Sequence, residues 1–488
     1  MWTYAQLKNA QADWQQPDWT SATAMLVDTA EPHLTGVSID TRTLQAGDVF
    51  FALRGAHSDG HAYLNQAVAQ GAVALVVESD SDALDWASIT RVPVLCVKDT
   101  RAALRQFAHW HRLQMPLKAL IGVTGSNGKT TTKAMLAHCL QRQFQVLATE
   151  GNLNNELGVP LTLLQIRPTH DYAVIEMGAN HAHEIGQLCE IAQPDRGIVT
   201  LAADAHLEGF GSLQTIIETK GELLAALPSD GYGVINLNSP GLTYWQTLCA
   251  HHHVPCIVFG EGRQADIQVL AVTESIEGLR FDVCYFVEGH PRVSTVALPM
   301  LGKHNAWNAV AAMAVCLQEG MDWDTLAKAM QAFKGVEQRL TTYPLQSGCL
   351  INDAYNANPS SMRSAIESLS ALKKAWPGSA KTVACLGAMG ELGTETQAAH
   401  QALAQALLLY EVDQVYLYGQ ATQGMAESLG ARAQWFEHHA ALWQAMQTDR
   451  AQQPDQAWLI LVKGSRAMHM ETIAQAVIRD WSEPTPAS

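Results

Sequence analysis

Paired cysteines, basic clusters and long hydrophobic runs are scarce in this chain of 488 residues. The nine cysteines form no C-x-x-C pair, and an odd number in a chain of this length favours reduced thiols over a disulfide framework. No hydrophobic run approaches the length of a membrane span, so stable insertion into a bilayer is not expected. The first residues also lack the basic segment and hydrophobic core of a secretory signal. We therefore expect a cytoplasmic protein.

The charge balance is acidic. Lysine and arginine together number 31 against 47 aspartates and glutamates, which gives a formal net charge of -16. An acidic surface without a stripe of lysine and arginine repels phosphate backbones, so we expect no nucleic acid as partner. Any anionic substrate must then be held by a local pocket.

One segment looks like a metal site. Two cysteines and three consecutive histidines lie within residues 249–256. Consecutive histidines of one regular element cannot all point at one ion, and structural zinc sites usually space their ligands in pairs. We expect no metal there.

The pattern of hydrophobic segments predicts an α/β protein of three domains, with no internal repeat and no coiled coil. Residues 1–100 predict a small α/β domain, 101–334 a central ATP-binding domain with a mainly parallel sheet, and 335–488 a Rossmann-like domain. Alternating strands and helices imply parallel strands, whose carboxyl ends bind ligands. The expected strands are 49–53, 73–77, 92–97, 119–123, 172–176, 197–200, 234–235, 383–386, 415–418 and 458–462, with an antiparallel extension at 279–287 and 293–298.

Residues 124–131 read TGSNGKTT, directly after the hydrophobic run 119–123. A strand that turns through two glycines into a helix directs backbone N–H groups and a helix N-terminus at one point, where an anion is favoured. Val123 replaces the first glycine of the usual phosphate-loop pattern, but the shorter G-x-x-G-K-T form remains. The loop predicts ATP binding by Gly125, Ser126, Asn127, Gly128, Lys129, Thr130 and Thr131, with Thr130 suited to Mg²⁺.

Glu176 ends the predicted strand 172–176 and is a candidate magnesium ligand. The same position is compatible with a carboxylate that is simply solvated at a strand end.

Lys220 lies on the hydrophobic face of the predicted helix 213–227. If it is buried, its pKa falls and the neutral amine can react or accept a modification. The alternative is a lysine at the edge of the face whose amine reaches solvent. The helix also contains Gly221, which indicates a close approach to its backbone.

Several polar loops remain open between two interpretations. The asparagines of 151–158, among them Asn152 and Asn155, either bind a polar ligand or form turns and helix caps. Asn305 and Asn308 either cap the helix that they begin or contact a base. His206 is a metal ligand or a capping residue. In the last block, residues 353–359 and 463–466 follow strand-like runs and are candidate ligand loops, although ordinary turns explain their Asn, Gly and Pro content equally well.

Taken together, ten segments in this order resemble the Mur ligases, the ATP-dependent amide ligases that build the peptide of the bacterial cell-wall precursor. They are TGSNGKTT, GNLNNELGVP, EMGANHAHEI, AHLEGFGS, TKGE, GKHNAWNA, EQRL, DAYNANPSSM, LGAMGELG and VKGSR. The resemblance extends over nearly the whole chain. Three of them, DAYNANPSSM, LGAMGELG and VKGSR, look most like the last ligase of the series, which joins D-alanyl-D-alanine to UDP-N-acetylmuramoyl-tripeptide.

The resemblance implies roles for single residues. Glu176 and His206 match family magnesium ligands, and Lys220 matches the lysine that the family carbamylates. Asn305 matches the asparagine beside adenine, and Arg339 and Asp353 match further nucleotide contacts. The substrate-binding positions are expected at Ser38, Asp40, Thr41, Arg42, Asp59, Gly60, His61, Asn152, Asn155, Asn356, Asn358, Lys463, Ser465 and Arg466, where Thr41 replaces the more usual serine.

The resemblance also implies catalysis through an acyl phosphate, with ATP, two Mg²⁺ ions and a carbamylated Lys220. We expect a monomer whose partners are the two small-molecule substrates. Alternatives are the third-residue ligase, a folyl-polyglutamate synthase, or an ATP-binding switch without catalysis. The roughly 100 residues before the phosphate loop disfavour the folate enzymes. The chain also lacks the D-N-P-[RK] segment usual in the third-residue ligase.

Overall fold

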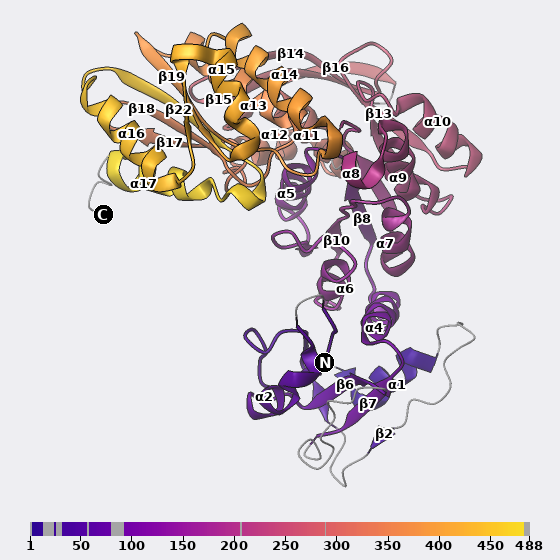
Figure 1. Ribbon diagram of the computed structural model, residues 1–488. Helices are drawn as coiled ribbons and strands as arrows, with labels where there is room; N and C mark the ends of the chain where they lie inside the picture. Colours follow the sequence, from indigo (N-terminus) through magenta and orange to yellow (C-terminus); the bar gives the residue numbers. More distant parts are fainter. Residues whose placement is uncertain are drawn as a thin grey trace, which may run out of the picture. The chain divides into compact units, whose positions relative to one another are not determined.

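The computed structural model describes residues 2–12, 24–25, 32–55, 58–79, 92–204, 207–287 and 289–482. They form a mixed α/β architecture with sheets of two, five, nine and six strands (Figure 1). One compact unit comprises Met1–Ile121, Gln145–Met177 and Gly186–Pro194, and the other Gly122–Phe144, Gly178–Ile185 and Asp195–Ser488. These units divide the chain differently from the boundaries near 100 and 334, which stay a prediction.

The α/β class is confirmed, and so are the strands expected from the sequence. Among the described residues, no helix has both the length and the hydropathy that crossing a membrane requires.

The first unit begins with a small α/β region. Its five-stranded sheet has the order β2-β7-β6-β5-β4, parallel except for β2. Phe50, Leu75 and Leu64 pack in its core. The elements are β1 Trp2–Thr3, α1 Tyr4–Ala12, β2 Ala24–Met25, β3 His33–Leu34, β4 Gly36–Ser38, β5 Asp48–Phe51, α2 Leu64–Ala69, β6 Ala74–Glu78, β7 Val94–Val97 and α4 Thr100–Gln114.

The nine-stranded sheet includes β8 (Ala119–Thr124), which continues from the first unit into the second. In the first unit the order is β8-β10-β9, with β9 Val146–Ala148, α6 Gly158–Leu163 and β10 Tyr172–Glu176. In the second it is β16-β15-β14-β13-β12-β11-β8. The elements there are α5 Lys129–Leu140, β11 Arg196–Val199, α8 Leu207–Phe210, α9 Leu213–Ala225, β12 Tyr232–Asn236, α10 Leu242–His251, β13 Cys256–Gly260 and β14 Ile267–Ser275. Helix α7 (Glu184–Ala192) spans the division between the units.

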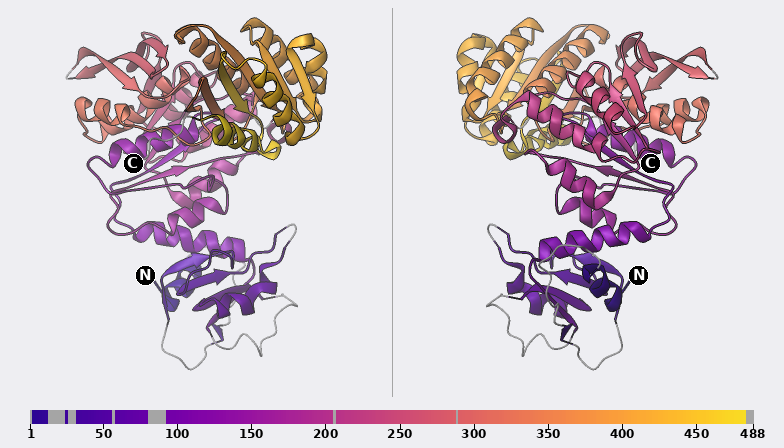
Figure 2. Two further views of the ribbon diagram at one scale, coloured as in Figure 1. Left: turned by 90° about the vertical axis from the view of Figure 1, so that its left-hand side faces the viewer. Right: turned by 90° about the vertical axis from the view of Figure 1, so that its right-hand side faces the viewer.

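The sheet changes direction after β14. Strands β11 to β14 pair in parallel, whereas β15 (Gly278–Val287) and β16 (His290–Leu298) continue in antiparallel pairing. Strands β15 and β16 appear in pink in Figure 2. The antiparallel extension is thus confirmed, with one strand more than the sequence predicted. Helices α11 (His304–Gln318) and α12 (Trp323–Gln331) follow.

The six-stranded sheet of the second unit has the order β17-β18-β22-β19-β20-β21, and only β17 is antiparallel. Alternate residues of its strands face two hydrophobic cores. Ile351 and Leu461 belong to the core with α13, and Leu350 and Ile460 to the core with α17. The elements are β17 Thr341–Leu345, β18 Gly348–Asp353, α13 Pro359–Ala375, β19 Ala380–Gly387, α14 Thr396–Leu409, β20 Gln414–Tyr418, α15 Gln423–Leu429, β21 Ala433–Phe436, α16 His439–Ala451, β22 Ala457–Lys463 and α17 Glu471–Trp481.

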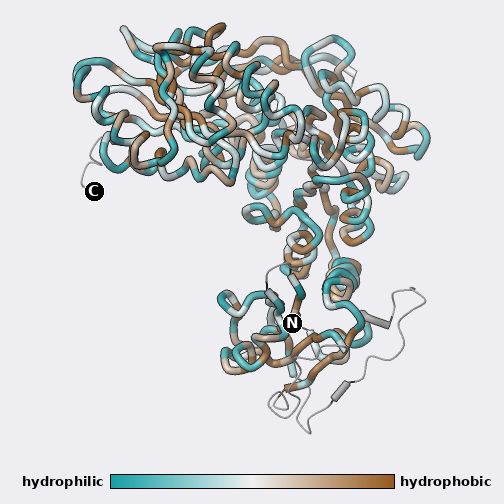
Figure 3. The backbone as a smooth tube through the Cα atoms, in the orientation of Figure 1, coloured by the Kyte–Doolittle hydropathy of each residue, from teal (hydrophilic) through white to brown (hydrophobic). Residues whose placement is uncertain are grey.

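Helices on both faces leave the parallel strands buried, as their nearly continuous hydrophobic sequences require. Figure 3 shows brown hydrophobic stretches inside this part of the chain and teal on outer turns of its helices. The carboxyl ends of β18 and β22 therefore remain as places where polar side chains can gather.

All nine cysteines are free thiols. Seven are buried, while Cys96 on β7 and Cys256 on β13 are partly exposed. That the thiols are reduced stays a prediction.

Candidate active site

The loop between β8 and α5 requires its two glycines. Gly125 and Gly128 have φ angles of 146° and 83°, which residues with a Cβ rarely adopt. A Cβ on Gly125 would lie 2.0 Å from Thr200 Oγ1, and one on Gly128 would lie 2.4 Å from Asn308 Oδ1. The neighbouring strand and helix thus approach the loop too closely for any side chain.

The phosphate loop holds its own lysine. Lys129 Nζ donates to the carbonyl oxygens of Gly125 at 2.7 Å and Ser126 at 3.2 Å. Ser126 in turn is fixed to the segment after β11, because its N–H donates to Leu201 O at 2.7 Å and its Oγ to Ala203 O at 2.9 Å. The loop is therefore held in place, with an ammonium group at its centre.

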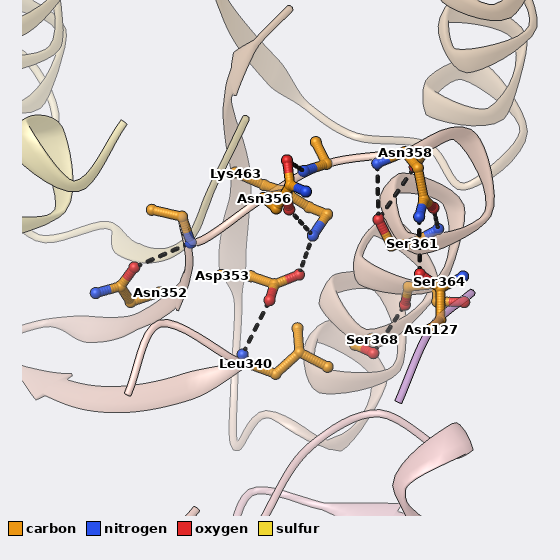
Figure 4. Close-up of polar contacts among 12 residues, drawn as sticks. Asn127, Leu340, Asn352, Asp353, Asn356, Asn358, Ser361, Ser364, Ser368 and Lys463 are labelled. Carbon is orange, nitrogen blue, oxygen red and sulfur yellow. Dashed lines mark hydrogen bonds and ion pairs between the residues drawn. The ribbon is translucent and has the colours of Figure 1, made fainter. Parts of the chain in front are cut away.

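Asn127 connects the phosphate loop to α13 (Figure 4). Its Nδ2 donates to Ser360 Oγ at 2.7 Å, and its Oδ1 accepts from Asn358 Nδ2 at 2.8 Å. Asn358 also caps α13, because its Oδ1 accepts from the N–H of Ser361 at 2.9 Å in a capping box. We call Asn127, Asn358 and Ser360 the loop bridge.

A cavity of about 230 Å³ opens beside the phosphate loop. Its wall comes from the loop, the ends of β11 and β12, the start of α11 and the last block of the chain. The lining residues are Asn127, Gly128, Thr131, Thr200, Leu201, Asn236, Asn238, His304, Asn305, Trp307, Asn308, Arg339, Leu340, Asp353, Ser360, Ser361, Ser364 and Lys463. All of them belong to the second unit.

The two asparagines at the start of α11 are paired with each other. Asn308 Nδ2 donates to Asn305 Oδ1 at 3.0 Å, and Asn305 Nδ2 donates to Leu301 O at 2.7 Å. Both side chains are buried and line the cavity. An amide offers two donors and an acceptor oxygen with two lone pairs. Besides these bonds, each side chain has a second N–H that could donate to a ligand, and the oxygen of Asn308 could accept from one.

Lys463 and Asp353 form a buried ion pair at the ends of β22 and β18. Lys463 Nζ lies 2.6 Å from Asp353 Oδ2, and the side chains are 1% and 9% exposed. Lys463 also donates to Asn356 O at 2.9 Å, while Leu340 N–H donates to the other oxygen of Asp353. Burial lowers the pKa of Lys463, and the neighbouring carboxylate opposes that shift. The amine therefore supports the cavity wall rather than reaching outward (Figure 4).

The other predicted residues of the last block lie around Tyr355. The guanidinium of Arg339 lies 4.1 Å from the centre of its ring, and that of Arg466 6.0 Å. Asn356 Oδ1 accepts from the N–H of Arg466 at 3.3 Å. Ser465 is buried, and its N–H donates to Ala388 O. Of the predicted residues in these loops, Arg339, Asp353 and Lys463 line the cavity, whereas Asn356, Asn358, Ser465 and Arg466 do not.

Lys220 is buried on α9 and only 2% exposed, which decides between the two interpretations of its sequence position. Burial lowers the pKa of Lys220 to about 7, and the nearby Lys129 charge acts in the same direction, against Glu184 and Glu222. Its Nζ lies 5.2 Å from the centre of the Phe210 ring. A neutral amine is thus accessible near neutral pH.

The close approach predicted at Gly221 is confirmed. A Cβ there would lie 3.1 Å from Leu248 Cδ2 and Tyr244 Cε1 and 3.3 Å from Trp245 Cδ1. The glycine thus lets α10 pack against α9 beside Lys220.

Glu176 ends β10 in the first unit and is 2% exposed. Its Oε1 accepts from Asn154 Nδ2 at 2.8 Å, and its N–H donates to Thr149 Oγ1. Asn155 Oδ1 accepts from the N–H of Gly158 at 2.9 Å, so this asparagine acts as a helix cap. The backbone carbonyl oxygen of Asn152 accepts from the N–H of Asn154 at 2.7 Å.

The segment 38–42 of the first unit is a closed turn. Ser38 Oγ donates to Asp40 O at 2.9 Å, and Thr41 is buried beside it. Asp40 holds Arg42 in an ion pair of 2.5 Å, although the Arg42 side chain remains 85% exposed. Hydrogen bonds from Arg42 lower the pKa of Asp40. The guanidinium is therefore oriented without being buried.

His61 is a buried histidine with both ring nitrogens engaged. Its Nδ1 lies 2.6 Å from Asp59 Oδ1, and its Nε2 accepts from the N–H of Glu78 at 2.9 Å. Because Nε2 accepts, the proton belongs on Nδ1. A Cβ on Gly60 would lie 2.7 Å from Leu53 N, so a glycine is required between them.

His206 lies outside the described residues. Among the residues that the structure describes, no group of three or more His, Cys, Asp or Glu side chains could hold a metal ion. That search includes residues 249–256, where the sequence predicted no metal site.

The cavity unites residues that the sequence singled out and residues that it did not. The predicted residues are Asn127, Gly128, Thr131, Asn305, Arg339, Asp353 and Lys463, and Asn308 was a candidate. The sequence reasoning missed Thr200, Leu201, Asn236, Asn238, His304, Trp307, Leu340, Ser360, Ser361 and Ser364. A signal existed for Asn236 and Asn238, since they follow the parallel strand β12 at its carboxyl end.

Family models match three consecutive parts of the chain. A "Mur ligase family, catalytic domain" matches residues 33–112, a "Mur ligase middle domain" 123–316 and a "Mur ligase, glutamate ligase domain" 338–466. Among curated proteins, the UDP-N-acetylmuramoyl-tripeptide–D-alanyl-D-alanine ligase of Escherichia coli is 36% identical, over 92% of this chain and 94% of the relative. The enzyme of that name from Bacillus subtilis is 34% identical, over 91% of this chain and 93% of the relative.

Solved structures give the same result. A crystal structure of MurF from Acinetobacter baumannii superposes with a TM-score of 0.86 at 30% identity, covering 98% of this chain and 99% of that one. The crystal structure of MurF ligase from Thermotoga maritima in complex with ADP superposes with a TM-score of 0.77 at 25% identity, covering 91% of this chain and 97% of that one. Sequence and fold agree along nearly the full length, and we conclude that the chain belongs to the Mur ligase family.

Proposed function

We propose that this chain is an ATP-dependent ligase that joins D-alanyl-D-alanine to UDP-N-acetylmuramoyl-tripeptide. The observation that carries the proposal is the cavity at the phosphate loop, in a chain that matches ligases of this specificity over nine-tenths of its length. Such a ligase makes the pentapeptide precursor of peptidoglycan. The cavity and loop supply what such a reaction needs, namely a place for a nucleotide and charge to stabilise its phosphates.

The phosphate loop is proposed to bind the triphosphate. Residues 125–131 direct the start of α5 at it, and Lys129 adds a full positive charge. Lys129 Nζ donates to carbonyl oxygens of its own loop, and a phosphate oxygen would offer this amine a charged acceptor. Asn305, Arg339 and Asp353 are proposed to hold the base and ribose.

The types of side chain at these positions are ones that magnesium uses. Thr130 offers a hydroxyl and Glu176 a buried carboxylate, and Mg²⁺ is usually bound by one or two carboxylates together with substrate phosphates. We propose Thr130, Glu176, His206 and a carbamylated Lys220 as residues that hold two such ions. When bound, magnesium offsets the negative charge of the transferred phosphoryl group.

Lys220 is proposed to carry the carbamate. Its neutral amine attacks carbon dioxide, an N–C bond forms and one proton is released. The product is a carboxylate-like group on a helix that is already packed. Support comes from its burial and from its pKa of about 7, which leaves much of the amine neutral at physiological pH.

The proposed reaction has two steps. An oxygen of the tripeptide carboxylate attacks the γ-phosphorus, the bond to the bridging oxygen breaks and ADP leaves. The amine of D-alanyl-D-alanine then attacks the activated carbonyl carbon, loses a proton and expels phosphate. Lys129 stabilises charge on the transferred group in the first step. Closure of the last domain would exclude water that hydrolyses the acyl phosphate.

The remaining residues are proposed to bind the other substrates. The uridine nucleotide sugar would be held by Ser38, Asp40, Thr41, Arg42, Asp59, Gly60 and His61. Asn152 and Asn155, which lie on either side of Asn154 in the sequence, are also proposed to bind substrate. Asn356, Asn358, Lys463, Ser465 and Arg466 would shape the site of the dipeptide in a C-terminal domain of 335–488. Because Lys463 and Asn358 are engaged inside the protein, they would act by supporting the loops. We further propose a monomer that works in the cytoplasm.

The test is phosphate release from ATP and magnesium with each substrate alone and with both together. Release only with both, together with a product heavier by the dipeptide minus water, is expected. Release with glutamate or a single diaminopimelate in place of the dipeptide would point to another ligase of the family. Binding of ATP without turnover under every combination would contradict the proposal and favour a non-catalytic switch.

A further inference from the structure

Arg339 lines the cavity beside the phosphate loop and remains partly exposed. In the described part of the chain, no hydrogen bond or ion pair engages its guanidinium, whose carbon lies 4.1 Å from the centre of the Tyr355 ring. Burial lowers the pKa of Lys463, a second residue of the cavity wall, and the nearby charge of Arg339 acts in the same direction. The guanidinium therefore has its five N–H donors to offer a ligand.

The turn that carries Arg339 is bonded to the carboxyl end of β18. Arg339 lies between Gln338 and Leu340, whose φ angles of 59° and 51° fall in the left-handed region. Leu340 N–H donates to Asp353 Oδ1 at 3.2 Å, and the N–H of Tyr355 donates to Gln338 O at 3.4 Å. These bonds fix the backbone of the turn, and the long side chain of Arg339 is left for the Tyr355 ring to orient.

The ring can orient the side chain because the face of an aromatic ring attracts a planar guanidinium, which stacks on it. An arginine that moves freely loses rotamer freedom when it binds a ligand, and this loss weakens binding. An arginine that already stacks on a ring loses less, so its contact with the ligand contributes more to affinity.

We propose that Tyr355 is a positioning residue, which orients the guanidinium of Arg339 for the bound nucleotide. This inference rests on the proposed function, because it takes the cavity to be the ATP site. Tyr355 acts through Arg339 and not by touching the nucleotide, since it is not among the residues that line the cavity. Its hydroxyl is not needed, because the ring face alone attracts the guanidinium.

The test compares Tyr355→Phe, which keeps the ring, with Tyr355→Leu, which removes it. Calorimetry would measure binding of the ATP analogue AMP-PNP with magnesium. The affinity should fall by about three- to tenfold in Tyr355→Leu and stay within about twofold of wild type in Tyr355→Phe. Melting temperatures without nucleotide would check that each variant is folded, and Tyr355→Met would take the place of Tyr355→Leu if that variant is not.

Arg466 provides a matched control at the same ring. Its guanidinium lies 6.0 Å from the centre of the Tyr355 ring and 3.3 Å from Glu471 Oε1, and Arg466 does not line the cavity. In an Arg339→Ala background, Tyr355→Leu should weaken binding no further, because the ring acts through that arginine. In an Arg466→Ala background, Tyr355→Leu should keep its full effect.

The outcomes are distinct. If wild type does not bind AMP-PNP at all, the proposed function fails. If wild type binds AMP-PNP and folded Tyr355→Leu binds it equally well, the inference alone is overturned. An equal loss in Tyr355→Phe would also overturn it, because that result assigns the effect to the hydroxyl. So would a loss that persists in the Arg339→Ala background, since the ring would then act by another route.

Discussion

At the scale of single residues, Lys129 concentrates positive charge where the phosphate loop needs it. We expect Lys129→Ala to abolish ligation while leaving the fold intact, because the bonds that the amine makes to Gly125 and Ser126 carbonyls lie within one loop. Steady-state phosphate release and circular dichroism would measure the two effects.

Lys374→Ala is the matched control for Lys129→Ala. It removes an equal charge from an exposed position near the end of α13, far in sequence from the phosphate loop. Its activity should stay within twofold of wild type, since single surface charges contribute little. Full activity of Lys129→Ala would contradict the ATP assignment of the loop.

Lys220 makes stability depend on pH. Its pKa is about 7 in the folded protein against 10.5 as the ordinary value, so between these values the unfolded chain holds a proton that the folded one lacks. The free energy of unfolding should therefore rise with pH across this window, by at most about 1.4 kcal/mol per unit from this group. Below pH 7 both states are protonated and the contribution is constant.

Urea unfolding of wild type and Lys220→Met in buffers free of carbon dioxide would isolate that contribution. The variant should be more stable at pH 7, and the difference should shrink as the pH approaches 10. If the free energies of unfolding of wild type and variant differed by a constant amount from pH 7 to 10, the amine would be charged in the folded protein over that range, and the prediction would be wrong.

The chemical role of Lys220 is a separate prediction. Lys220→Ala should be nearly inactive and should partly recover with acetate, since a small carboxylate can occupy the place of the carbamate. Phosphate release with increasing acetate would measure the recovery, with Lys129→Ala as the variant that acetate does not rescue. Full activity without any additive would contradict the carbamate.

At the scale of elements, the start of α13 serves two purposes through one side chain. Asn358 caps the helix with its oxygen and reaches Asn127 with its nitrogen. Asn358→Ala should lose both and lower the free energy of unfolding by about 1 kcal/mol. Asn358→Asp keeps the acceptor but not the donor, so its stability should stay near wild type while its KM for ATP rises as in the alanine variant.

Chemical denaturation and ATP titrations of both variants would distinguish the contribution of the helix cap from that of the loop bridge. An ATP KM that is normal in Asn358→Asp but raised in Asn358→Ala would show that the cap alone matters. The loop bridge would then contribute nothing to nucleotide binding.

Sequence patterns predicted elements where a local signal existed. The strand, glycines and lysine of the phosphate loop lie within a dozen residues. The hydrophobic face of α9 placed Lys220 on or beside that face but left open whether its amine is buried, and the structure shows that it is. The sequence did not predict strand β14, because its pairing with β15 shifts between Val269 and Ala271. This shift interrupts the alternation of buried and exposed residues that identifies a strand. Strand β13 begins at Cys256, inside the segment that resembled a metal site.

The cavity could be predicted only in part. Asn236, Ser364 and Trp307 meet there through packing of elements that are far apart in sequence, and no local pattern fixes such convergence. In the sequence, asparagines that cap helices could not be distinguished from asparagines that bind a ligand. The structure shows that Asn358 caps α13 and that Asn155 Oδ1 accepts from the N–H of Gly158, at the start of α6.

At the scale of the whole molecule, the two substrates are expected to protect different units. The residues that line the nucleotide cavity all belong to the second unit, whereas the candidate uridine contacts belong to the first. Hydrogen exchange with ADP should slow at 125–131 and 359–364, because ordering a loop around a ligand suppresses its opening. The UDP-sugar peptide should slow exchange at 38–42 and 59–61. Protection by ADP confined to residues 38–61 would contradict this assignment.

The distribution of thiols gives the protein a built-in pair of labelling sites. Cys96 and Cys256 are partly exposed while the other seven cysteines are buried, and one lies in each unit. Burial raises the pKa of Cys96, and the hydrogen bond with the Cys249 thiol together with burial raises the pKa of Cys256, so reaction of both thiols with a maleimide dye would need alkaline conditions. A donor and an acceptor fluorophore on these native positions would report the separation of the two units by energy transfer, turnover by turnover, without any engineered cysteine.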